Sequence, residues 1–115
     1  MERQFKHLKE KDEKELLDLI SILEKEDLKA ELRGSAVFTS DYYDLDLNVW
    51  DTRTQYRDNR EIINDCLKKA NAKEVYFSSP VAATWMVGRW MFHINETKFD
   101  IIYTPWGSSM KGYQK

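Results

Sequence analysis

The chain has a single cysteine, Cys66, among its 115 residues. It therefore has no intrachain disulfide and no zinc site built from several thiolates. The thiol lies between apolar residues at helical spacing, including Ile63 and Leu67. This pattern favours a buried packing role over a nucleophile.

Long apolar stretches are also missing, since no run approaches the roughly 20 residues that a membrane helix needs. The first residues, MERQFKHLKEKDEK, are charged throughout and lack the apolar segment of a signal peptide. We therefore expect a cytoplasmic protein with no membrane partner. The net charge of -2 provides no overall attraction to nucleic acid, so nucleic acid is not expected as the main partner.

Hydrophobic residues make up 42% of the chain and aromatic residues 13%, which is enough to form a core. A length of 115 residues suits a single domain. We expect one domain over residues 1–115, with flexible polar ends at 1–9 and 106–115.

Two amphipathic helices are predicted from apolar residues three and four positions apart. They span Glu10 to Asp27 and Asp58 to Asn71. Asp58 or Asn59 is the expected N-cap of the second helix, because short polar side chains accept hydrogen bonds from free helical amides.

Five strands are predicted from alternating or continuous apolar residues. They span Leu28–Arg33, Asp44–Trp50, Lys73–Ser78, Trp85–Ile94 and Lys98–Tyr103. In the third strand Val75 and Phe77 are expected to point inward. Gly88 suggests a bulge in the fourth strand, and the compact turn after it indicates a hairpin with the fifth.

The most informative stretch runs from Leu32 to Trp50. Asp44 and Asp46 lie one residue apart on a predicted strand, so both carboxylates point the same way, with about 7 Å between their alpha carbons. Two like charges that close favour a bound cation. Upstream, Gly34 and Ser35 allow a tight turn whose backbone amides can face an anion.

A third carboxylate, Asp100, lies in the middle of the last predicted strand. An aspartate among large apolar residues is costly to bury unless a partner or ion receives it. That partner could be a metal, Arg89 or Lys98. Simpler interpretations of the other features also stay open: an ordinary turn for the Gly-Ser pair, and a solvated face or a structural cation site for the aspartate pair.

The tyrosines before the acidic strand also have two interpretations. Tyr42 and Tyr43 could stack on a nucleotide base or could cover the edge of the sheet, and the second use is the more common one.

The pattern Gly-Ser, eight residues and Asp-x-Asp resembles the signature of the polymerase-beta-like nucleotidyltransferase superfamily. The short chain is most similar to its minimal nucleotidyltransferase branch. The resemblance covers roughly Leu28 to Pro105. Many relatives continue after Gly-Ser with a small residue, arginine and glycine, where this chain has Ala36, Val37 and Phe38.

The resemblance implies an α+β nucleotidyltransferase-type fold, with a mixed sheet of about five strands and helices packed on one face. It implies an enzyme that transfers a nucleoside monophosphate, AMP from ATP, to an acceptor hydroxyl with two Mg²⁺ ions. Asp44, Asp46 and Asp100 would bind the metals and act in catalysis, with Asp100 as general base. Gly34 and Ser35 would hold the phosphates of the nucleoside triphosphate.

The resemblance also implies a partner protein. The acceptor would be a tyrosine of a toxin, which makes this chain the antitoxin of a toxin-antitoxin pair. One alternative is transfer to a small molecule such as an aminoglycoside, with an acceptor site shared across a homodimer. Another is a non-catalytic binding module with the same fold.

Overall fold

The computed structural model describes residues 5, 8–52, 59–78 and 88–104. Its elements, in chain order, are α1 (Glu10–Glu24), β1 (Leu28–Arg33), the 3₁₀ turn η1 (Gly34–Val37), β2 (Leu45–Asp51), α2 (Arg60–Lys69), β3 (Lys73–Ser78), β4 (Gly88–Ile94) and β5 (Thr97–Thr104). Both predicted helices and all five predicted strands are present. The first helix ends three residues early, because Asp27 adopts a positive φ of 63° and turns the chain into β1.

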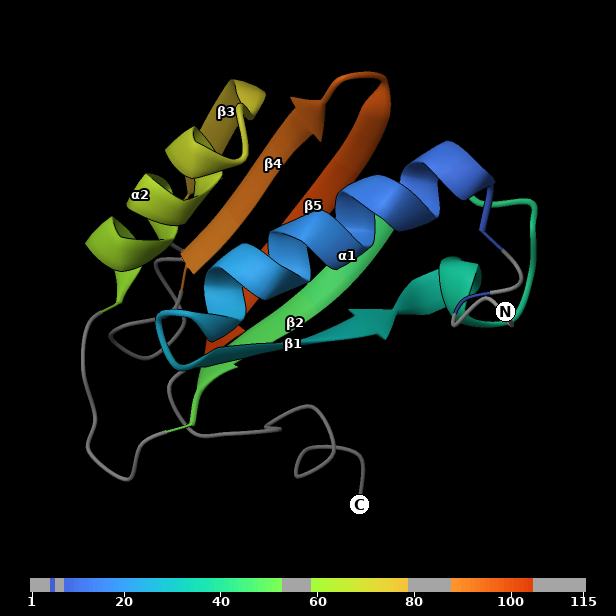
Figure 1. Ribbon diagram of the computed structural model, residues 1–115. Helices are drawn as coiled ribbons and strands as arrows, with labels where there is room; N and C mark the ends of the chain where they lie inside the picture. Colours follow the sequence, from blue (N-terminus) through green and yellow to red (C-terminus); the bar gives the residue numbers. More distant parts are fainter. Residues whose placement is uncertain (1–4, 6–7, 53–58, 79–87, 105–115) are drawn as a thin grey trace.

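The strands form one five-stranded sheet in the order β1-β2-β5-β4-β3. The pairing of β2 with β5 is parallel and the other three pairings are antiparallel. Both helices lie on the same face of this mixed sheet (Figure 1). The predicted α+β architecture is therefore confirmed, and the opposite face of the sheet, which we call the open face, carries no described helix.

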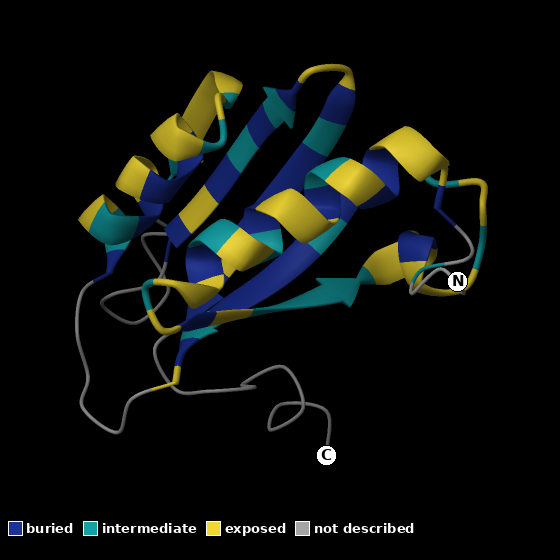
Figure 2. Ribbon diagram, in the orientation of Figure 1, coloured by how far each residue is buried: buried dark blue, intermediate teal, exposed yellow. Residues whose placement is uncertain are grey.

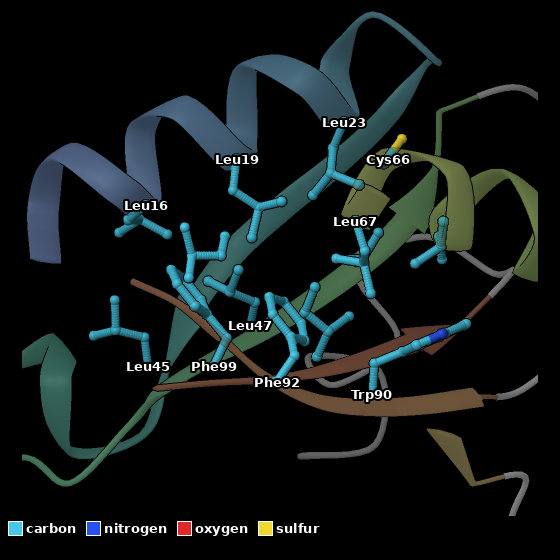
Figure 3. Packing of buried hydrophobic residues seen from close by; sticks show 14 of the residues in the cluster. Leu16, Leu19, Leu23, Leu45, Leu47, Cys66, Leu67, Trp90, Phe92 and Phe99 are labelled. Atoms are coloured by element: carbon cyan, nitrogen blue, oxygen red, sulfur yellow. The ribbon is translucent and has the colours of Figure 1, made fainter. Parts of the chain in front are cut away.

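The core lies between the helices and the sheet. On β2, Leu45, Leu47 and Val49 are at most 2% exposed and point toward the helices. Figure 3 shows the leucines of α1 directed at the aromatic and aliphatic side chains of the strands, while the outer surface of α1 is exposed (Figure 2). Each fully buried leucine contributes about 1.5–3 kcal/mol to folding.

Cys66 belongs to this core, as its position in the apolar pattern predicts. Burial raises the pKa of its thiol to about 11, so the side chain is neutral near pH 7. A neutral, buried thiol packs as a small apolar group rather than acting as a nucleophile.

The second helix has Asn59 at its N-cap position, as predicted, but the predicted capping hydrogen bond is absent. The side-chain amide nitrogen of Asn59 instead donates to Asp51 Oδ2 at 2.8 Å and to Tyr103 Oη at 2.9 Å. Because Asn59 is fully buried, it anchors the start of α2 to β2 and β5. The other candidate, Asp58, lies outside the described residues.

Val75 and Phe77, which are predicted to point inward, are not buried. The two residues are 46% and 41% exposed. The reason is the place of β3 at the edge of the sheet, where it has one neighbouring strand instead of two. Phe77 still packs its ring against Trp90, with 4.9 Å between the ring centroids.

The predicted bulge lies in β3 rather than at Gly88. The register of β3 against β4 shifts between Lys73 and Tyr76, and Glu74 has a φ of 54°. Gly88 pairs regularly with Tyr103. A side chain at Gly88 would meet the rings of Phe77 and Trp90 at 2.9 Å, so this glycine makes room for aromatic packing.

The β4-β5 hairpin is confirmed, and Ile94 and Thr97 form its closing pair. The predicted start of β4 at Trp85 and the expected flexible ends lie largely outside the described residues. Within the described part of the chain, none of the helices combines the length and the apolar character required to cross a membrane.

Candidate metal and nucleotide site

The parallel pairing of β2 with β5 brings the three predicted carboxylates together on the open face. Asp46 is directly opposite Asp100 in the register, and Asp44 immediately precedes β2. One carboxylate oxygen from each residue lies within 4.8 Å of the others. The cluster follows from strand alternation: Leu45 and Leu47 face the helices, so Asp44 and Asp46 face away from them.

The electrostatics of this cluster favour a cation. Burial, followed by the negative charges of Asp44 and Asp100, raises the pKa of Asp46 from 3.8 to about 6. Three carboxylates at such short separations repel one another unless a proton or a metal ion offsets their charge. Hard carboxylate oxygens are the ligands that Mg²⁺ prefers, so the donor set suits this ion.

The Gly-Ser pair lies directly against the carboxylates. Gly34 has a φ of 77°, and a Cβ atom placed on it would come within 2.5 Å of Asp46 Oδ2. Glycine is therefore required both by the left-handed backbone conformation and by the close approach of Asp46. Ser35 follows in the exposed turn η1, where its carbonyl oxygen accepts the amides of Phe38 and Thr39.

Arg89, on β4, forms a bidentate salt bridge with Asp100. Its Nε donates to Asp100 Oδ1 at 3.1 Å and its Nη2 donates to Asp100 Oδ2 at 2.7 Å. This pairing is one of the alternatives that the sequence left open, and here it coexists with the carboxylate cluster. The positive charge of Arg89 acts against the other influences by lowering the pKa of Asp46.

A hydrogen-bond network holds the segment that leads into Asp44. Tyr42 donates its hydroxyl to Asp12 Oδ2 at 2.6 Å and accepts the amide of Lys9 at 3.0 Å. Thr97, the first residue of β5, donates to Asp12 Oδ1 at 2.5 Å. Tyr42 is thus a structural residue rather than a base platform, and Asp12 connects the entrances of both strands that carry the carboxylates.

Tyr43 differs from its neighbour because 82% of the residue is exposed. The Lys98 ammonium lies 4.5 Å from the centre of its ring. This aromatic side chain beside Asp44 is free to contact a ligand.

A pocket of about 280 Å³ opens on the carboxylates from the open face. Its described lining consists of Arg33, Asp46, Leu47, Asn48, Asp100 and Ile102. Sequence reasoning did not select Arg33 or Asn48 as site residues. The signal was present for Asn48, which continues the alternation of Asp44 and Asp46 on the same face of β2.

No family model matches the chain, and no curated protein matches it. Seven chains of solved structures do match. One of them comes from the polymerase core of TRAMP, an RNA surveillance complex, with a TM-score of 0.57 and 17% sequence identity. The match covers 77% of this chain and 29% of that chain, so this chain spans less than a third of its length. With its five-stranded mixed sheet and its helices on one face, the chain has a nucleotidyltransferase-type α+β fold.

Proposed function

We propose that this chain is a metal-dependent nucleotidyltransferase that transfers AMP from ATP to an acceptor hydroxyl. The main support is the cluster of Asp44, Asp46 and Asp100, whose ligand oxygens lie within 4.8 Å of one another next to Gly34. This arrangement lies in a nucleotidyltransferase-type fold, on the face of the sheet that is not covered by α1 and α2.

The reaction joins the acceptor oxygen to the α-phosphorus of ATP. The bond between the α-phosphorus and the bridging oxygen breaks, and pyrophosphate leaves with the bonding electrons. Asp44, Asp46 and Asp100 would hold two Mg²⁺ ions, which supply charge neutralisation on the triphosphate and lower the pKa of the acceptor hydroxyl. Asp100 would take the proton of that hydroxyl as general base.

Gly34 and Ser35 hold the phosphates in this proposal. Glycine leaves the backbone bare, so amides of the turn and the Ser35 hydroxyl can donate to phosphate oxygens. Arg89 orients the Asp100 carboxylate through its two hydrogen bonds. Bidentate hydrogen bonds between an arginine and a carboxylate have a well-defined geometry.

We further propose that the acceptor is a tyrosine of a partner toxin, with this chain acting in the cytoplasm as the antitoxin. Support for this part comes from the resemblance of the Gly34-to-Asp46 pattern to the minimal nucleotidyltransferase branch. Transfer to an aminoglycoside by a homodimer is the alternative acceptor within the same chemistry.

A non-catalytic binding module is the second candidate, and a specific contact favours it. Both oxygens of Asp100 accept hydrogen bonds from Arg89, so a cation of the protein itself already contacts the cluster. In this case the Arg89 guanidinium offsets part of the negative charge in place of an ion, and the site binds a ligand without catalysing transfer.

Radiolabelled ATP and Mg²⁺ separate these functions. The purified protein is incubated alone, with the protein encoded beside its gene, and with an aminoglycoside. Label on the neighbouring protein supports the toxin partner, whereas label on the aminoglycoside supports the alternative. The Asp44→Asn/Asp46→Asn variant is the control and should transfer no label while keeping the wild-type circular dichroism spectrum.

Calorimetry with a nonhydrolysable ATP analogue tests the binding module directly. Magnesium-dependent binding that the double variant loses supports the enzyme. If the wild type transfers no label and binds the analogue equally well with and without Mg²⁺, the enzymatic proposal is wrong.

A further inference from the structure

Asn48 is a buried polar residue whose side-chain hydrogen bonds are not made. It lies on β2 two residues after Asp46, and its register partners are Glu31 on β1 and Ile102 on β5. The residue is 2% exposed, and neither its Oδ1 nor its Nδ2 has a hydrogen-bond partner. A buried amide without hydrogen-bond partners lowers the stability of the folded chain. A bound ligand or water that supplies the missing hydrogen bonds would remove this cost.

The surroundings of Asn48 form part of the candidate site. Asn48 lines the same pocket as Asp46 and Asp100. Its volume of about 280 Å³ is close to the lower end of the roughly 300–1,000 Å³ typical of small-molecule sites. Ile102, the register partner of Asn48 on β5, lines the pocket too and is 38% exposed, so the amide lies beside a pocket wall that reaches the surface and from which a ligand would approach it.

We propose that Asn48 positions the acceptor by hydrogen bonding to a peptide group of it, an inference that depends on the nucleotidyl transfer proposed above. A primary amide donates through its nitrogen and accepts through its oxygen, so it can pair with both the C=O and the N–H of a peptide. Asn48 thereby becomes a positioning residue, while the chemistry stays with the carboxylates.

The distance between Asp46 and Asn48 along β2 determines how long the acceptor side chain must be. Residues two apart on a strand are separated by about 7 Å, which is the distance between the Asp46 and Asn48 positions along β2. A tyrosine can span this separation with its hydroxyl at the carboxylates and its backbone amide at Asn48. Serine and threonine hydroxyls lie too close to their own backbone to do so.

The charges around the pocket favour a peptide over a nucleic acid. Among the described residues that line it, Arg33 is the one cation, and its Nε lies 3.6 Å from Glu31 Oε1. Arg89 nearby is engaged by Asp100. Nucleic-acid binding draws most of its affinity from rows of cations on phosphates, and this lining contains no such row among its described residues.

Two small acceptors test the role of Asn48 in catalysis. N-acetyl-L-tyrosine N-methylamide presents a phenol with peptide groups, and p-cresol presents the phenol alone. With radiolabelled ATP and Mg²⁺, the wild-type protein should use the first with a kcat/KM at least 10-fold higher. Asn48→Leu should reduce this ratio to near one, mainly through a higher KM for the amide-bearing acceptor.

Two control variants accompany this measurement. Asn48→Gln keeps the primary amide and should recover part of the preference. Asn64→Leu removes an amide that bonds Trp90 on the helix-covered side and should leave the ratio unchanged. A ratio that is the same in wild type and Asn48→Leu overturns the proposal.

Nuclear magnetic resonance provides a readout that is independent of turnover. The side-chain NH₂ signals of Asn48 are identified by their loss in Asn48→Leu, and the wild type is then titrated without ATP. The capped tyrosine should shift these signals saturably, and p-cresol should not. Unchanged signals would mean that the amide binds a buried water or only packs in the sheet, and would overturn the proposal.

A short single-stranded oligoribonucleotide forms the third arm of the titration. If it shifts the Asn48 signals and the capped tyrosine does not, the subsite binds a nucleobase edge and the peptide proposal is wrong. Saturable shifts without any label transfer refute the proposed enzyme but retain the subsite. Transfer with an unchanged ratio and unshifted signals refutes the subsite alone.

Discussion

Asp46 is a half-buried carboxylate whose pKa responds strongly to its surroundings. Its pKa rises from 3.8 to about 6 because of burial and the charges of Asp44 and Asp100. The folded state thus binds a proton more tightly than the unfolded chain between these two values. Asp46 must therefore reduce stability as the pH rises from about 4 to about 6.

We expect Asp46→Asn to remove this contribution. Relative to wild type in a chelating buffer, the variant should gain about 1–2 kcal/mol of unfolding free energy between pH 4 and pH 7, after allowance for solvent screening. Urea unfolding across this range measures the difference. Asp18→Asn, on the exposed face of α1, is the control and should track the wild type. A pH-independent difference for Asp46→Asn would contradict the assigned electrostatics.

At Gly34, the addition of a single carbon atom should change both stability and metal binding. In Gly34→Ala the new methyl group would lie 2.5 Å from Asp46 Oδ2 and would require a positive φ. We expect a loss of about 1–3 kcal/mol in stability, together with weaker Mg²⁺ binding because Asp46 must move. Thermal unfolding and metal titration by calorimetry measure both effects.

Ser35→Ala is the matched control for Gly34→Ala. It changes the neighbouring residue of the same turn, adds no atom near Asp46 and should leave stability within about 0.5 kcal/mol of wild type. Equal stabilities for Gly34→Ala and Ser35→Ala would show that the turn is more compliant than its geometry implies.

At the scale of elements, Asp12 connects three pieces of structure that the chain order keeps apart. It lies in the first turn of α1 and accepts hydrogen bonds from Tyr42, before β2, and from Thr97, at the start of β5. The residue is 6% exposed, so its carboxylate is held mainly by protein groups. The segments that position Asp44 and Asp100 are thereby coupled.

A double-mutant cycle on Tyr42→Phe and Thr97→Val tests this coupling. Each change should cost about 1–3 kcal/mol, since each removes a donor to a buried carboxylate. Because both donors share Asp12, the double variant should differ from the sum by about 0.5 kcal/mol or more. Denaturant unfolding supplies the four values. Additive effects would indicate that the two hydrogen bonds act independently, and Tyr43→Phe, on an exposed ring, should be neutral.

At the scale of the whole molecule, a metal ion held by the three carboxylates would link metal binding to folding. The three carboxylates come from two segments far apart in the chain, so the unfolded chain does not present them together. A ligand that binds only the folded state raises the unfolding free energy, by about 2.7 kcal/mol at 100 times its dissociation constant. Removing the metal should lower stability correspondingly.

We expect Mg²⁺ to raise the melting temperature in a concentration-dependent manner. The Asp44→Asn/Asp46→Asn variant should show no such rise, although without metal it should be at least as stable as wild type because repulsion has been removed. Differential scanning calorimetry with Mg²⁺ and with a chelator provides the comparison. An equal rise in both proteins would mean that the ion binds elsewhere.

Local patterns in the sequence were sufficient for most of the fold. Strand alternation placed Leu45 and Leu47 on one face and Asp44 and Asp46 on the other, and apolar spacing identified both helices. The errors occurred where tertiary position overrides local pattern. Val75 and Phe77 are exposed because β3 is an edge strand, and Gly88 is small because two aromatic rings converge on it.

The chain by itself determined which side chains share a face, because the period of a strand is a local property of the backbone. It therefore determined that Asp44 and Asp46 lie together after a glycine turn. Only the tertiary structure decided that β5 pairs in parallel with β2, which places Asp100 opposite Asp46 and Arg89 against it. Strand order and register depend on long-range packing of the whole core, and the unpaired amide of Asn48 becomes visible only when that packing is complete.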